Sequence, residues 1–189
     1  MGTVILNGAA IEDSMVDELD RILVQILTGK GESFRDFRLR EYDISPCRSC
    51  GSCAFRSPGK CTFDDDMPQI IRAAANSPLL VMLTPVRFGG YSSQLKKAVD
   101  RLMVMGLPLY IVKGGHLLHP TRYGNPTALL GIGVAENPLP GEEDAFGTLV
   151  ARNALNMLVK SHKALVLHPT DSIADMEHRI REALEGVGY

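Results

Sequence analysis

The chain has 189 residues, of which 45% are hydrophobic, and its formal net charge at pH 7 is −2. A chain of this length commonly folds as one domain, and its hydrophobic fraction can supply a core without a metal or disulfide staple. The small net charge gives no electrostatic reason to expect nucleic acid or an anionic membrane as a partner. Because no apolar run is long enough for a membrane helix and the N-terminus enters an apolar strand at once, we expect a cytoplasmic protein.

The apolar residues alternate along the chain between the spacing of strands and the spacing of helices. Five runs have the composition of strands: residues 3–7, 33–44, 78–85, 127–133 and 163–169. Helical spacing of apolar residues follows each strand, in the stretches 14–27, 67–75, 95–102, 147–160 and 173–184. Ser14, with Asp17 three residues later, fits a capping box, so we place the start of the first helix there.

Five such strand–helix repeats predict an α/β fold, a doubly wound five-stranded parallel sheet with helices on both faces. Ligands of these folds bind at the carboxyl ends of the strands, which singles out the loops 7–14, 84–92 and 133–146. Residues 105–126 do not fit the repeat. We expect them to be an insertion in a single domain over 1–189, whose apolar part covers the site or meets another subunit.

All the cysteines of the chain lie in one expected loop, residues 45–66, which we call the cysteine loop. Their spacing is C-x2-C-x2-C-x7-C: Cys47, Cys50, Cys53 and Cys61. In a reducing compartment such a cluster favours metal or redox chemistry over disulfides. A zinc ribbon would separate its two C-x2-C pairs by a dozen or more residues, whereas the first three cysteines here follow the C-x2-C-x2-C run of ferredoxins. An iron–sulfur cluster is therefore favoured, and thiols that are redox-active without metal, or zinc, remain alternatives.

Three segments occur together in an order that resembles a known family. They are NGAA at 7–10, the cysteine block followed by DDM at 65–67, and TPVRFGGYSSQLKKAVDR at 84–101. The chain resembles the flavodoxin-like NADPH-dependent FMN reductases and, within them, the iron–sulfur flavoproteins. The resemblance covers residues 3–170. It implies a sheet of order 2-1-3-4-5, bound FMN, a [4Fe–4S] cluster on the four cysteines, and a homodimer or homotetramer.

The same resemblance places FMN at the three loops that end the first, third and fourth strands. The expected cofactor-binding residues are Gly8, Ala9, Ala10, Ser14, Thr84, Pro85, Val86, Arg87, Phe88, Gly89, Gly133, Val134 and Ala135. Free backbone N–H groups in the first loop would suit a phosphate. Glu12 and Asp13 would repel that phosphate, so we expect modest FMN affinity, and a plain helix cap is the alternative for this loop. For the second loop the alternative is a turn with a surface arginine.

The remaining polar residues are assigned ordinary roles. The five histidines have no carboxylate or cysteine at ligand spacing and are expected to be structural or solvated. Lys96, Lys97, Asp100 and Arg101 are expected to form an exposed helix face, and residues 64–66 to cap the next helix.

The predicted function is that of an FMN-dependent oxidoreductase that uses NAD(P)H and small-molecule or protein electron donors and acceptors, without a catalytic side chain, because the flavin carries the chemistry. The alternative is a non-enzymatic electron carrier or redox sensor without flavin. The two are distinguished by whether the protein contains bound FMN.

Overall fold

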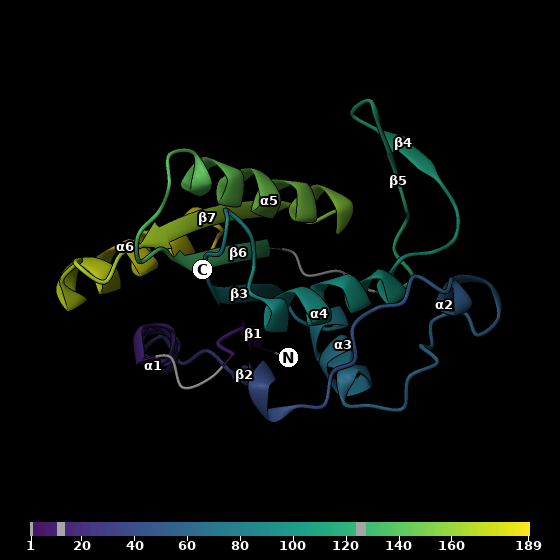
Figure 1. The fold of residues 1–189 in the computed structure, drawn as a ribbon, viewed down its shortest axis with the longest axis horizontal. Coiled ribbons are helices and arrows are strands. Elements are labelled where there is room, and N and C mark those ends of the chain that lie inside the picture. Colours follow the sequence, from purple (N-terminus) through teal and green to yellow (C-terminus); the bar gives the residue numbers. More distant parts are fainter. Residues whose placement is uncertain (1, 11–13, 124–127) are drawn as a thin grey trace.

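The computed structural model describes residues 2–10, 14–123 and 128–189 of the chain (Figure 1). Its centre is a five-stranded parallel sheet with the strand order β2-β1-β3-β6-β7. The strands are β1 (Thr3–Asn7), β2 (Phe34–Arg38), β3 (Leu79–Pro85), β6 (Ala128–Val134) and β7 (Ser161–Leu167). Counted within the sheet, this is the order 2-1-3-4-5, so the predicted topology is confirmed.

Helices cover both faces of the sheet, as predicted. The helices are α1 (Ser14–Gly29), α2 (Ser52–Phe55), α3 (Met67–Ala75), α4 (Ser93–Arg101), α5 (Glu142–Asn156) and α6 (Ile173–Gly186), with short 3-10 turns η1 (Leu39–Glu41) and η2 (Leu102–Met105). One face packs against α1 and α6, and the other packs against α3, α4 and α5. A sheet enclosed in this way must be apolar on both sides.

The central strand β3 shows how the sequence builds the two cores. Each of its residues is buried. Leu80 and Met82 face the core under α3, α4 and α5, whereas Val81 and Leu83 face the core under α1 and α6. Because side chains alternate along a strand, the uninterrupted apolar run at 78–85 supplies both cores at once.

Two expected elements have a boundary that lies five or more residues from its expected position. The second strand is only five residues long, because the chain turns into η1 at Leu39 instead of continuing to residue 44. The helix expected from Gly147 begins at Glu142 and includes Gly147 in its interior. Glu142, Glu143 and Asp144 form its first turn, where negative charge is favourable at the N-terminal end of the helix dipole.

The described part of the expected insertion, residues 105–123, contains an antiparallel hairpin that stands away from the sheet (Figure 1). Its strands are β4 (Ile111–Lys113) and β5 (His116–Leu118). Tyr110, Val112 and Leu117 are more than 60% exposed, which is unusual for a cluster of large apolar side chains. Within the described ranges, no helix is long and apolar enough to cross a membrane.

Candidate functional site

The first loop at the carboxyl edge of the sheet is packed tightly against the start of α4. The backbone N–H of Gly8 donates to Leu83 O, and the Ser92 hydroxyl donates to Gly8 O. A Cβ atom on Gly8 would lie 2.7 Å from the Leu95 Cβ atom, so this position admits only glycine. Ala9 is buried and donates its N–H to the side chain of Asn7.

The part of this loop that was expected to hold a phosphate is only partly described. Ala10 is exposed at the end of the described segment, and Glu12 and Asp13 lie outside the described residues. The helix begins at Ser14, as predicted. The side chain of Ser14 is not among the parts of the chain that the structure describes. Asp17, the expected capping partner, accepts hydrogen bonds from Arg40 at 3.0 and 3.1 Å.

The second loop contains a tight turn, from Arg87 to Gly90, that presents an aromatic side chain. Arg87 and Gly90 exchange backbone hydrogen bonds of 3.0 and 2.8 Å, and the two residues between them have positive φ, 51° at Phe88 and 71° at Gly89. This pair of positive φ values defines a type I′ turn. Phe88 is 92% exposed. The turn therefore holds a large apolar ring in solvent on a left-handed backbone that disfavours such a residue.

A cavity of about 230 Å³ lies between the second and third loops. Of the expected flavin contacts, Val86, Arg87, Phe88 and Ala135 line it, together with residues 136–139 and Glu142. Of the other expected contacts in these loops, Gly89 is buried in the turn against Ala145 of α5. The rest lie in the buried ends of β3 and β6: Thr84, Pro85, Gly133 and Val134. The cavity thus joins two of the three predicted loops, and its exposed ring and guanidinium form a surface suited to a planar aromatic ligand.

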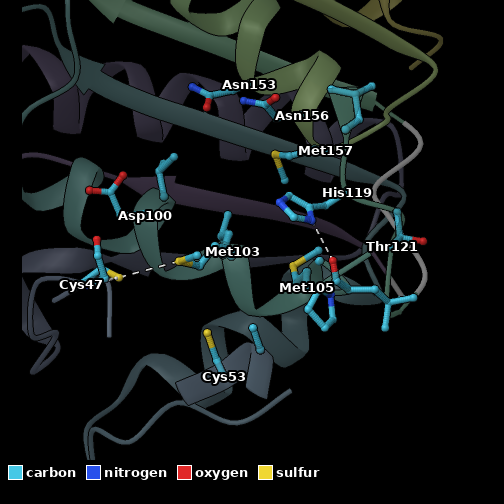
Figure 2. A pocket seen from close by; sticks show the side chains of 18 of the residues that line it. Cys47, Cys53, Asp100, Met103, Met105, His119, Thr121, Asn153, Asn156 and Met157 are labelled. Carbon is cyan, nitrogen blue, oxygen red and sulfur yellow. Dashed lines mark hydrogen bonds between the residues drawn. The ribbon is translucent and has the colours of Figure 1, made fainter. Parts of the chain in front are cut away.

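The four cysteines surround one small cavity of about 20 Å³. Cys47, Cys53 and Cys61 are partly buried and Cys50 is exposed. The Cys47 Sγ atom lies 3.8 Å from the Met103 Sδ atom, the contact that is dashed in Figure 2. In the part of the chain that the structure describes, no three or more potential ligands are arranged to hold a single metal ion. The four sulfur atoms therefore surround a cavity and do not converge on one point.

The thiols differ in their ease of ionisation. The backbone N–H of Ser52 is the main cause that lowers the pKa of Cys50, because it donates to the sulfur. Burial raises the pKa of Cys53, and the neighbouring Cys61 raises it further. Cys50 is consequently the exposed thiol that forms a thiolate more readily than an ordinary cysteine.

Arg101 lies at the base of the cysteine cavity and is held by a buried ion pair. Its Nη1 and Nη2 atoms donate to Asp65 at 2.8 and 3.0 Å, and Nη1 also donates to Ser45 O at 2.8 Å. The guanidinium lies 5.0 Å from the ring centre of Phe63, which Arg48 approaches as well. The Nε atom of Arg101 is buried and has no hydrogen-bond partner within the described segments. An anionic group in the cysteine cavity would give this N–H an acceptor.

The assignment of Arg101 to an exposed helix face was wrong, because its side chain is 1% exposed. The sequence held a signal, since Arg101 follows the buried Ala98 by three residues and therefore lies on the same face of α4. The prediction of caps at 64–66 holds in part. Asp65 accepts from the Met67 N–H at the start of α3, but its main partner is Arg101.

A second polar cluster, which the sequence analysis missed, lies beside the first loop. Asn7 donates to Asp17 at 3.2 Å and to Asp20 at 3.0 Å. The Arg38 Nε atom lies 3.7 Å from a carboxylate oxygen of Asp20 and 3.6 Å from one of Asp36. No N–H group among the described residues donates to the other, buried oxygen of each carboxyl group, and the two carboxyl groups can share a hydrogen bond when one of them is protonated. Burial raises the pKa of Asp36 to about 7, and the charge of Asp20 adds to the rise.

A parallel sheet of order 2-1-3-4-5, with loops that can bind a ligand at the carboxyl ends of its strands, is the flavodoxin-like architecture. The family model described as NADPH-dependent FMN reductase matches residues 1–136. The chain belongs to this family.

Curated relatives agree with that assignment. The chain is 27% identical over 96 residues to an iron-sulfur flavoprotein of Methanocaldococcus jannaschii, a match of 51% of this chain and 49% of that protein. It is 33% identical over 63 residues to an iron-sulfur flavoprotein of Methanosarcina thermophila, 33% of this chain and 32% of the relative. The matches thus span half or less of the length of these curated relatives.

Two solved structures share the fold across almost the whole chain. One is the NAD(P)H:quinone oxidoreductase from Methanothermobacter marburgensis, with a TM-score of 0.69, 17% identity and coverage of 99% of this chain and 96% of that one. The other is an FMN-dependent NADH-azoreductase from Bacillus anthracis, with a TM-score of 0.71, 13% identity and complete coverage of both chains.

Proposed function

We propose that the protein is an FMN-dependent oxidoreductase that takes electrons from NAD(P)H and carries a [4Fe–4S] cluster on Cys47, Cys50, Cys53 and Cys61. The observation that carries the proposal is the grouping of all four cysteines around one cavity whose base is a buried arginine with a free N–H. Membership of the NADPH-dependent FMN reductase family and likeness to iron-sulfur flavoproteins support it.

The flavin ring would lie in the cavity between the second and third loops. Val86, Arg87, Phe88 and Ala135 would contact it, and Gly8, Ala9, Ala10 and Ser14 would face the phosphate. Bound FMN supplies hydride and single-electron chemistry, so no side chain has to act as an acid or base. The Arg87 guanidinium is exposed at the cavity, where it can stack on a ring and favour negative charge.

The cysteine cavity has the donor set that a cluster requires. In a four-iron cube each thiolate binds a different iron, which matches sulfurs that surround a space and do not converge. Arg101 would donate its Nε–H to the cluster, and the positive charge of Arg101 and Arg48 would stabilise the anionic group. Since a cavity of about 20 Å³ is smaller than a cube, the loop would open around the cluster.

Iron analysis tests the cluster. Protein prepared without oxygen is expected to contain about four irons per chain, and Cys50→Ser to lose most of them, because the four cysteines share one cube. Ser49→Ala, a neighbour in the same loop, is the matched control and keeps its iron. Four free thiols and no iron in the anaerobic protein would contradict this part of the proposal. A yellow protein without iron would support the flavin enzyme and contradict the cluster.

A redox sensor that works through its thiols is the second candidate function. It is favoured by one observation, the exposed Cys50 with its lowered pKa. Such a sensor would need neither flavin nor iron. A colourless protein after anaerobic preparation and addition of FMN would select it, whereas a flavin spectrum would exclude it.

We also propose that the 189 residues form a single domain that self-associates as a homodimer or homotetramer. The support is the β4–β5 hairpin and the residue before it, where Tyr110, Val112 and Leu117 are exposed. Sedimentation at micromolar concentration distinguishes this from a monomer. Val112→Lys on the hairpin is expected to weaken the association, and Lys113→Glu serves as a control on the same strand.

A further inference from the structure

A cavity of about 630 Å³ adjoins the cysteine loop (Figure 2). It is enclosed by α4 and η2, the C-terminal end of α5, the β4–β5 hairpin and the cysteine loop. Cys47, Ser49, Cys53 and Met103 line both this cavity and the cysteine cavity. Among the described residues it shares none with the flavin cavity. Its volume lies in the range of small-molecule sites, roughly 300–1,000 Å³.

The walls of this cavity are apolar and rich in thioether sulfur. Val99 and Leu118 supply branched aliphatic surface, and Met103, Met105 and Met157 point their side chains toward the space (Figure 2). Thioether groups are polarisable and make favourable contacts with aromatic rings. A flat aromatic molecule is therefore better suited to these walls than a flexible polar one.

The charge of the cavity is balanced. Within the described lining, the side chains with a permanent charge are Lys96 and Asp100, and the Lys96 ammonium lies 2.5 and 2.6 Å from the two carboxylate oxygens of Asp100. This pair leaves no net charge to attract an ion. A thiolate or a cluster at Cys47 and Cys53 would add negative charge beside the cavity and repel an anion. The ligand should accordingly be uncharged.

Hydrogen-bonding groups lie on two sides of the cavity. Asn153 and Asn156 are one helical turn apart on α5 and lie next to each other in Figure 2. One amide hydrogen of Asn153 is donated to the Tyr91 hydroxyl at 2.9 Å, which leaves the other hydrogen for a ligand. These amides are donors that suit carbonyl oxygens.

His119, which follows β5, also lines the cavity and is fixed in one orientation. Its Nδ1 atom lies 2.9 Å from Leu107 O and 2.9 Å from Leu109 O. Because both partners are acceptors, Nδ1 carries the hydrogen, and Nε2 is the nitrogen that remains for a ligand. Nε2 then has no hydrogen and can only accept, so it suits a hydroxyl or N–H group of a ligand, whereas the α5 amides suit a carbonyl oxygen.

We propose that this cavity is a second ligand site, which binds an uncharged planar aromatic compound with a ring carbonyl group, of the quinone type, beside Cys47 and Cys53. That such a compound serves as the electron acceptor rests on the proposed function, whereas its binding does not. The inference itself is one of binding and assigns no electron transfer.

Calorimetric titration of the oxidised protein, without any reduced nicotinamide, tests the binding. The probe is 2,3-dimethyl-1,4-naphthoquinone, whose substituted quinone ring leaves no open position for thiol addition. We expect saturable binding that Asn156→Asp weakens roughly tenfold, through a lost donor and a new negative charge. The control Gln25→Glu adds the same charge on the exposed face of α1 and leaves the affinity unchanged. Absence of binding, or equal affinity in Asn156→Asp, overturns the inference.

The cysteines report where the probe binds. In air-purified protein with free thiols, the probe at about ten times its Kd is expected to slow iodoacetamide alkylation of Cys47 and Cys53 roughly tenfold, because only the unbound fraction reacts. Cys50 and Cys61 do not line this cavity and keep their rates. Uniform protection of all four cysteines, or of none, overturns the placement. Iron and flavin contents are measured separately, so a failure of the proposed function would leave this result distinguishable.

Discussion

Arg101 and Asp65 are joined by two hydrogen bonds of 2.8 and 3.0 Å, and their side chains are only 1% and 2% exposed. Asp65 also accepts from the N–H groups of Ser45 and Met67. The pair therefore ties the end of α4 to the beginning of α3 and to the first residue of the cysteine loop. Burial by itself would raise the pKa of Asp65, but these hydrogen bonds outweigh it and lower the pKa below its usual value.

Breaking this pair is expected to destabilise the protein strongly. Arg101→Met leaves the Asp65 carboxylate buried without its partner, a change that typically costs about 3–5 kcal/mol of unfolding free energy. Because the folded pKa of Asp65 is depressed, the stability from its charge is present above the unfolded pKa and is lost as the pH falls through the folded value. Urea unfolding of both proteins at pH 7 and at pH 3 measures the effect.

The double variant Arg101→Met/Asp65→Leu shows whether the destabilisation comes from the broken ion pair or from lost side-chain packing. It removes both charges but also the hydrogen bonds to Ser45 and Met67, so we expect it to recover only part of the stability that Arg101→Met loses. Arg181→Met removes an exposed ion pair with Glu177 and is expected to cost less than about 1 kcal/mol. A double variant no more stable than Arg101→Met would show that the ion pair is not the cause.

The carboxyl groups of Asp20 and Asp36 predict a loss of stability as the pH rises. Burial raises the pKa of Asp36 to about 7, next to Asp20, Arg38 and Glu41. Between about pH 4 and pH 7 the unfolded chain has released this proton while the folded protein still holds it, so the unfolding free energy falls with pH over this window. Asp36→Asn is expected to remove this slope and to stabilise the protein at pH 8.

Thermal unfolding between pH 4 and pH 8 measures that slope. Asp43→Asn is the matched control, because Asp43 is an exposed residue in the loop that follows β2 and η1. The control is expected to keep the slope of the wild type. Identical slopes in wild type and Asp36→Asn would mean that Asp36 is ionised at neutral pH in the folded protein.

The thiols are expected to react in an order set by their surroundings. In metal-free protein at pH 7, iodoacetamide should alkylate Cys50 before Cys53, since the lowered pKa and exposure of Cys50 give it more accessible thiolate. Mass spectrometry of peptides over time measures both rates. Ser52→Pro removes the N–H that donates to Cys50 and is expected to slow its reaction, whereas Ser52→Ala keeps that N–H. Equal rates in the two variants would exclude the backbone donor as the cause.

Phe88 is expected to lower the stability of the folded protein and to strengthen FMN binding. Phe88→Asn places a residue that tolerates positive φ in the turn and should raise the unfolding free energy of the flavin-free protein by roughly 1 kcal/mol. Loss of the exposed ring should weaken FMN binding about three- to tenfold, the usual strength of an aromatic contact. Fluorescence titration with FMN measures this, and Phe88→Tyr is expected to retain the affinity. An unchanged affinity in Phe88→Asn would place the flavin elsewhere.

The elements that could be predicted are those whose sequence pattern is local. The apolar runs of β3 and β6 and the spacing in α3 fixed their positions within a residue or two. The end of β2 could not be found in this way, because the alternating pattern of residues 33–44 continues through η1.

The parts of the site that escaped prediction depend on contacts between distant residues. Arg101 and Asp65 are 36 positions apart, and Asp20 and Asp36 come from different elements. No local pattern shows that a charged residue will find a buried partner. The cavity beside Cys47 depends in the same way on the position of the β4–β5 hairpin, which belongs to no repeat of the fold.

Helix α4 sets the distance between the first loop, which is proposed to face the flavin phosphate, and the cysteine cavity. At its start Ser92 holds the first loop through Gly8 O, and at its end Arg101 lines the cysteine cavity. Nine helical residues fix this span at about 13 Å, and each residue turns the helix by about 100°. A one-residue insertion in α4 would therefore swing Arg101 away from Asp65 while leaving the first loop intact. Evolution or design can change the span only in steps close to a whole turn if both ends are to keep their partners.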